Sequence, residues 1–109
     1  MNFKATPTFA RAIKRLKKKY RNIEKDIQYL RLILTENPAA GIPLGSNLFK
    51  IRLSSSDISK GKSGSLRVIY YLMLASELIV FLDIYAKSEK EDVPISEIKK
   101  ILKGFKNDG

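Results

Sequence analysis

Apolar residues recur every three or four positions after residue 6, a spacing that predicts a helix with one buried face. The apolar stripe consists of Phe9, Ala12, Ile13, Leu16 and Tyr20. Thr6 as N-cap and Pro7 at the first helical position mark the predicted start of this helix.

A second helical pattern follows from Asn22, which can cap it. Its apolar row consists of Ile23, Ile27, Leu30 and Leu34. Asn37 and Pro38 end the pattern, since the residue before a proline avoids the helical region. The sequence therefore predicts two amphipathic helices in antiparallel succession.

Prolines and glycines between residues 38 and 45 predict a loop. The next segment, residues 48–53, alternates apolar and basic side chains with the period of a strand. Alternation sends Lys50 and Arg52 to one face of that strand, and the apolar side chains between them to the other.

Two long β-prone runs, residues 66–74 and 78–86, follow a polar turn region at residues 54–65. The three residues between the runs are few enough for a hairpin. Both runs are apolar on both faces, which predicts central strands covered by helices on at least one side.

The pattern breaks at residues 87–92, and Pro94 or Ser96 is expected to start a last helix. Its inward side chains are expected to be Ile95, Ile98, Leu102 and Phe105. Residues 2–5 can add an edge strand. The predicted fold class is α+β, with residues 1–109 forming one domain of two helices on a mostly antiparallel sheet and a short C-terminal helix.

Composition excludes several kinds of metal site and catalytic site, because the chain contains neither Cys nor His. Thiolate zinc sites, cysteine nucleophiles and histidine acid–base catalysis are therefore excluded. No apolar run is long enough to span a bilayer, and Met1 to Thr6 is too short and polar to begin a secretory signal, so we expect a cytoplasmic protein.

The formal net charge is +10, and residues 1–75 carry all of the cationic excess. Such an imbalance favours nucleic acid, an anionic membrane surface or an acidic protein as the partner. The cations of the first helical segment are Arg11, Lys14, Arg15, Lys17, Lys18, Lys19 and Arg21. They are either a solvated helix face or a surface that binds RNA phosphates or an acidic partner. A membrane-surface helix is disfavoured, because the core needs its apolar face.

Three segments taken in order resemble the RelE/ParE superfamily of toxins, and most closely its RelE/HigB-like branch. They are residues 45–53 (GSNLFKIRL), 64–71 (GSLRVIYY) and 80–90 (VFLDIYAKSEK). The resemblance covers roughly residues 3–102. It implies a toxin of a type II toxin–antitoxin system, an mRNA interferase that cleaves messenger RNA on the ribosome and so inhibits translation.

Members of this branch surround the scissile phosphate with basic residues. The resemblance places Lys50, Arg52, Arg67 and Lys87 in the catalytic site, with Lys90 as an RNA-binding residue. Many relatives also have a tyrosine or histidine near the C-terminal end, whereas this chain has neither after Tyr85. The identity of the proton donor is therefore open.

Cations alone can catalyse RNA cleavage by the 2′-hydroxyl, without metal or cofactor. Arginine binds phosphate through paired hydrogen bonds and keeps its charge, so Arg52 and Arg67 suit stabilisation of the transition state. A lysine acts as a base only where nearby cations favour its neutral form. Lys50 is the candidate base or proton shuttle, and Lys87 the group that supports or protonates the leaving group.

Each candidate also has a structural interpretation, since alternating cations on a strand are more often a solvated sheet face. Tyr70 and Tyr71 point to opposite faces, so at least one should pack in the core. Tyr85 is a possible acid or base, or a residue that supports the site. The acidic residues at 89, 91 and 92 favour helix capping over a metal site.

The expected partners are a cognate antitoxin, the ribosome and messenger RNA. One alternative is the ParE branch, which shares this fold but inhibits DNA gyrase by binding. Another is a non-catalytic nucleic-acid-binding module or decayed toxin, which would bind RNA in a salt-sensitive manner without cleaving it.

Overall fold

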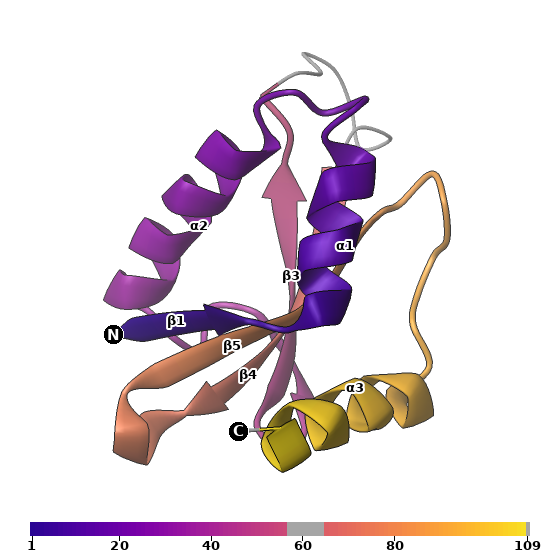
Figure 1. Ribbon diagram of the computed structural model, residues 1–109. Helices are drawn as coiled ribbons and strands as arrows, with labels where there is room; N and C mark the ends of the chain where they lie inside the picture. The colour runs from indigo at the N-terminus through magenta and orange to yellow at the C-terminus, as the bar shows by residue number, and fades with distance from the viewer. Residues whose placement is uncertain (57–64, 109) are drawn as a thin grey trace.

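Five strands form one sheet in the order β1-β5-β4-β3-β2, with helices on both of its faces (Figure 1). The computed structural model describes residues 1–56 and 65–108. In chain order the strands and helices are β1 (Asn2–Ala5), α1 (Pro7–Leu16), α2 (Ile23–Glu36), β2 (Ile42–Gly45), β3 (Leu48–Ser54), β4 (Ser65–Met73), β5 (Leu78–Ala86) and α3 (Ile95–Asp108). Among the strands of the described residues, only β1 pairs in parallel, so the predicted α+β class with a mostly antiparallel sheet is confirmed.

The start of α1 is fixed to the sheet by Thr6. Its Oγ1 accepts a hydrogen bond from the Phe9 N–H at 3.1 Å, as expected of an N-cap, and donates to the Leu82 carbonyl oxygen at 2.7 Å. The preceding residues form β1, which runs parallel to β5 with Asn2 opposite Leu78. The edge strand at residues 2–5 is therefore present.

The first helix ends at Leu16, four residues before the end of its predicted apolar stripe. A turn formed by Lys17 to Lys19 follows, and the Tyr20 N–H donates to the Leu16 carbonyl oxygen at 2.8 Å. This turn returns the Tyr20 ring to the core, where only 1% of the residue is exposed. The stripe is buried as predicted, but the last cations lie on a turn instead of a helix face.

The two N-terminal helices cover the same face of the sheet and diverge from the turn that joins them (Figure 1). Asn22 occupies the N-cap position of α2, although no side-chain capping bond forms there. Each helix buries the row expected from its spacing, and together these residues form the larger core with one face of β3, β4 and β5.

Residues 42–45 were expected to lie in a loop, and this prediction is wrong for β2. The strand pairs antiparallel with β3, placing Pro43 opposite Phe49. Since β2 is an edge strand, Pro43 can lack an N–H without breaking a ladder on both sides. Gly45, with φ of +90°, then turns the chain back toward β3.

The long apolar runs form the central strands β4 and β5, as their pattern predicted. A short 3₁₀ turn at Leu74–Ser76 joins them, and Glu77 adopts a left-handed conformation with φ of +49°. The ladder shifts register between Ile69 and Tyr70, where β5 carries an extra residue. Of the predicted polar turn at 54–65, residues 57–64 lie outside the described residues.

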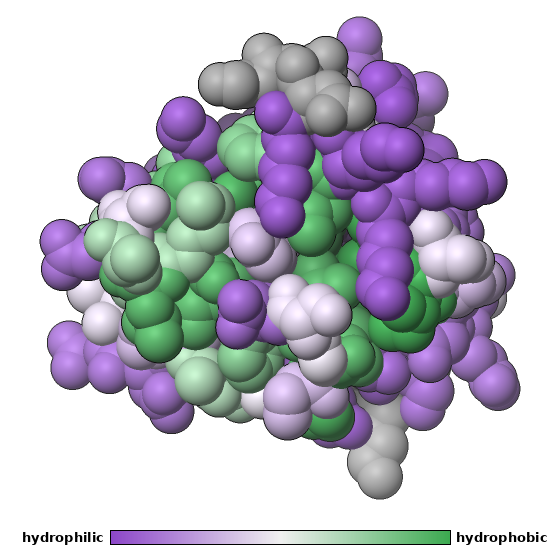
Figure 2. Space-filling view, turned by 90° about the horizontal axis from the view of Figure 1, so that it is seen from below, coloured by the Kyte–Doolittle hydropathy of each residue, from purple (hydrophilic) through white to green (hydrophobic). Residues whose placement is uncertain are grey.

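The last helix, α3, covers the opposite face of the sheet. It begins directly after Pro94, which is one of the two predicted starts. Ile98, Leu102 and Phe105 pack inward, but Ile95 is 39% exposed, so its inward placement is wrong. Ile101 contacts the core in its place because it lies one helical turn, three residues, after Ile98. Seen from below, apolar surface spreads over this end of the molecule with hydrophilic side chains around it (Figure 2).

Candidate active site

Three of the four predicted catalytic cations lie in adjacent rows across the sheet. Arg52 on β3 is directly opposite Arg67 on β4, and Arg67 is opposite Tyr85 on β5. Lys50 lies in the next row, opposite Ile69, two residues from Arg52 along β3. Directly opposed residues have Cβ atoms roughly 5 Å apart, so both arginines can reach the same phosphate.

These residues share the face of the sheet that α3 covers in part. The residues between them along β3 and β4 pack in the core beneath α1 and α2, whereas Leu48, Ile69 and Tyr85 belong to the core beneath α3. Arg52 is exposed, Lys50 and Arg67 are partly buried, and Tyr85 is fully buried. The row of cations therefore lies at the border between solvent and the smaller core.

One carboxylate connects Lys50 with Tyr85. The Lys50 Nζ lies 3.5 Å from Asp92 Oδ1, and the Tyr85 hydroxyl donates to the same oxygen at 3.4 Å. Burial first, and then the nearby Asp92 carboxylate, raise the pKa of Tyr85 to about 12. The Tyr85 hydroxyl therefore lies beside Asp92, and its role as an acid or base or as a residue that supports the site stays a prediction.

The segment that leaves β5 brings Lys87 and Lys90 to the site. The Lys87 N–H donates to the Ser65 carbonyl oxygen at 3.2 Å. Lys87 therefore lies beside Ser65, which is two residues before Arg67 on β4. Lys90 folds back so that its Nζ lies 5.4 Å from the centre of the Tyr85 ring. Both side chains are exposed.

Glu89 fixes the shape of this segment. One carboxylate oxygen accepts from the Ala86 N–H at 3.0 Å, and the other pairs with Arg15 of α1. The sequence had assigned the acidic residues 89, 91 and 92 to helix capping. Glu89 and Asp92 instead hold the segment against α1 and Lys50, contacts that depend on the path of the chain and leave no signal in local sequence.

Asp83 is a buried carboxylate close to the same face that was not singled out by sequence reasoning. It lies opposite Ile69 and is 6% exposed, and its Oδ1 accepts from the Ile84 N–H at 2.8 Å. Desolvation raises the pKa of Asp83, although Ile84, Lys90 and Arg15 oppose the shift. Its signal in the sequence is a lone acidic residue within an apolar strand.

The basic residues of the first helical segment form a separate exposed surface. Arg11, Lys14 and Arg15 lie on α1, Lys17, Lys18 and Lys19 on the turn, and Arg21 just beyond it. The Lys17 ammonium pairs with Glu24 at 3.0 Å. This surface and the face of the sheet that carries Arg52 and Arg67 meet at the contact between Arg15 and Glu89.

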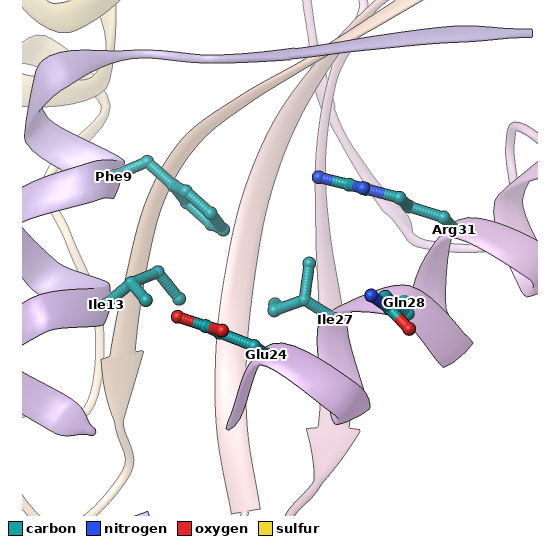
Figure 3. A pocket seen from close by; sticks show the side chains of 6 residues that line it. All are labelled: Phe9, Ile13, Glu24, Ile27, Gln28 and Arg31. Atoms are coloured by element: carbon teal, nitrogen blue, oxygen red, sulfur yellow. The ribbon is translucent and has the colours of Figure 1, made fainter. Parts of the chain in front are cut away.

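A cleft of about 250 Å³ opens between α1 and α2, on the face of the sheet opposite Lys50, Arg52 and Arg67. Phe9, Ile13 and Ile27 point into it, with Glu24, Gln28 and Arg31 along α2 (Figure 3). Within residues 1–56 and 65–108, no three acidic side chains gather in a group that could hold a metal ion. No helix in the described part of the chain is long and apolar enough to cross a membrane.

Comparison with known proteins identifies the fold. No protein-family model matches the sequence, and neither does any curated protein. Among solved structures, the chain is similar to a mutant of the E. coli toxin RelE in the free state, with a TM-score of 0.57 and 17% identity. The match covers 83% of this chain and 86% of the other. The chain therefore has the RelE-type fold that the sequence resemblance implied.

Proposed function

On this RelE-type fold, we propose that the chain is the toxin of a type II toxin–antitoxin system and cleaves messenger RNA on the ribosome. The observation that carries the proposal is the direct opposition of Arg52 and Arg67, with Lys50 in the adjacent row of the same face. Like charges directly opposed on a sheet repel each other. An anionic ligand between them turns this repulsion into attraction, and a phosphodiester has the required charge and geometry.

The reaction needs no metal. The 2′-hydroxyl attacks the adjacent phosphorus and loses its proton, and the bond from phosphorus to the 5′-oxygen breaks as that oxygen gains a proton. Arg52 and Arg67 stabilise the charge that develops on the phosphate oxygens. Lys50 takes up or relays the first proton, and Lys87 supports or protonates the leaving oxygen. The products are a 2′,3′-cyclic phosphate and a 5′-hydroxyl.

The ribosome supplies the positioning that such a site lacks. Lysine is a weak acid and a weak base near neutral pH, so the rate depends on RNA held in line for attack. The exposed cations from Arg11 to Arg21 and Lys90 contact ribosomal RNA or messenger RNA phosphates. The whole chain, residues 1–109, acts as one cytoplasmic domain under this proposal.

The antitoxin is proposed to carry acidic segments that cover these basic surfaces. Its binding would remove Arg52 and Arg67 from contact with RNA and neutralise part of the net charge of +10. An acidic protein encoded beside this chain that abolishes cleavage when added in equal amount would support this partner.

The function is tested by the chemistry of the cut ends. The protein is first treated with EDTA. It is then incubated with a labelled messenger RNA in a reconstituted translation reaction, either with programmed ribosomes or without ribosomes. We expect cuts only with ribosomes, each with a 2′,3′-cyclic phosphate at one end and a 5′-hydroxyl at the other. Absence of cleavage, or ends with a 5′-phosphate, would contradict the proposal.

A further inference from the structure

The acidic residue Asp92 lies within the proposed cationic site. Its Oδ1 is 3.5 Å from Lys50 Nζ and accepts hydrogen bonds from the Tyr85 hydroxyl at 3.4 Å and from the Val93 N–H at 2.9 Å. Three donors therefore converge on one carboxylate oxygen. This is the arrangement in which a phosphate oxygen is bound by a lysine, a hydroxyl and a backbone amide.

The chain around Asp92 holds this carboxylate in place. Val93, the next residue, is 3% exposed in the core beneath α3, and Tyr85 is fully buried under Lys90. Glu89 anchors the segment that leads to Asp92. The backbone is thus fixed on both sides of Asp92.

The side chain itself has room to leave. The Asp92 side chain is 65% exposed, whereas that of Lys50 is 21% exposed. A rotation about the Asp92 side-chain bonds carries the carboxylate into solvent without moving α3 or Val93. Lys50 and the Tyr85 hydroxyl would stay at the site with their donors available.

We infer that Asp92 is a built-in competitor of RNA, whose carboxylate occupies the position of a substrate phosphate oxygen at Lys50 in the free protein. This inference rests on the proposed function. RNA binds by displacing the Asp92 carboxylate from Lys50 and Tyr85, so the free protein has a lower affinity for stray RNA. Asp92 is consequently a regulator of binding at this site.

Such competition predicts a specific kinetic pattern. Removing the charge of Asp92 relieves both its pairing with Lys50 and its repulsion of the incoming phosphate. The affinity for RNA should rise by about threefold to tenfold, the range expected for loss of a partly exposed ion pair plus a nearby like charge. KM should fall by the same factor.

The test compares Asp92→Asn with Glu91→Gln. Both variants raise the net charge by one at neighbouring exposed positions, so a general electrostatic effect changes them equally. Asparagine retains an oxygen that can accept from Val93 and Tyr85, which preserves the local structure. The probe is a fluorescent 2′-O-methyl RNA oligonucleotide, which the chain can bind but cannot cleave, and its affinity is read by anisotropy.

Binding by Asp92→Asn that is about threefold to tenfold tighter than wild type, with Glu91→Gln within about twofold, is the expected result. Equal affinities in the two variants would overturn the competitor role while leaving the proposed function intact. A loss of cleavage in Asp92→Asn with unchanged binding would also overturn it, since Asp92 would then act in the reaction. No binding by any variant would contradict the RNA-binding site and the inference together.

Discussion

Arg52 and Arg67 lie directly opposite each other on adjacent strands of the sheet. An opposed pair of like charges costs stability, and both side chains also face the partly buried side of the sheet next to Tyr85. No other described cation pair in the ladder is in direct register across β3 and β4. The cost is explained if the pair binds an anion.

The first prediction concerns Arg67→Ala. We expect RNA cleavage to fall by at least about 100-fold, the usual effect of removing a group that stabilises transition-state charge. The free energy of unfolding should stay within about 0.5 kcal/mol of wild type or increase, since the like-charge repulsion is relieved. Single-turnover cleavage and urea denaturation measure the two quantities.

Two control variants make this result specific. Arg31→Ala removes an arginine from the cleft on the opposite face and should leave cleavage near wild type. Arg67→Lys keeps the charge but loses the paired hydrogen bonds, so cleavage should be intermediate. Strong unfolding of Arg67→Ala, or equal loss in Arg31→Ala, would argue that Arg67 is structural.

The second prediction concerns stability at high pH. Burial raises the pKa of Tyr85 from 10.0 to about 12 in the folded chain. Between about pH 10 and pH 12 the unfolded chain loses this proton while the folded chain keeps it, so the free energy of unfolding falls as pH rises. A two-unit difference corresponds to at most about 2 to 3 kcal/mol.

Tyr85→Phe isolates this effect, because the ring stays and only the hydroxyl is removed. The variant should lose less stability than wild type across the same pH window in parallel denaturation experiments. At neutral pH its stability should differ by no more than about 1 kcal/mol, because the hydroxyl makes one long hydrogen bond. If the free energy of unfolding depends on pH in the same way for both proteins, burial does not raise the pKa of the Tyr85 hydroxyl.

The third prediction concerns Glu89, which holds the segment carrying Lys87 and Lys90. In Glu89→Gln the pair with Arg15 is lost, and we expect the Ala86 amide to exchange its hydrogen faster. The loss of stability should be small, about 0.2 to 1 kcal/mol, since both side chains are partly exposed. Hydrogen exchange by mass spectrometry measures the effect, with Glu91→Gln as the unaffected control.

The fourth prediction concerns the salt dependence of RNA binding. Each cation that contacts a phosphate contributes about 0.7 to the slope of log affinity against log salt for a single strand. Lys50→Gln, Arg52→Gln and Arg67→Gln should each lower that slope by about this amount. Lys25→Gln, on α2, should leave the slope unchanged, and a uniform change in all four variants would favour a diffuse charge effect.

Much of the fold was predictable because its signals are local. Thr6 and Pro7 start α1, the spacing of the apolar rows specifies both buried helix faces, and the two long apolar runs form β4 and β5. The short strand β2 was missed because a proline and a glycine fall within four residues. Its pairing depends on β3, which a local pattern does not include.

The candidate site was predictable only in part, for the same reason. Alternation along β3 put Lys50 and Arg52 on one face, but only the register between strands places Arg67 opposite Arg52. The contact of Asp92 with Lys50 joins a strand to a loop 42 positions away, so no spacing rule contains it. Roles of these residues in catalysis stay predictions.

The most direct test of the central claim is primer extension on one messenger RNA in a reconstituted translation reaction, with wild-type protein, Arg67→Ala and Arg31→Ala. The account predicts ribosome-dependent stops with wild type and Arg31→Ala, and none with folded Arg67→Ala. Stops of equal strength in Arg67→Ala, or no stops with wild type, would contradict it.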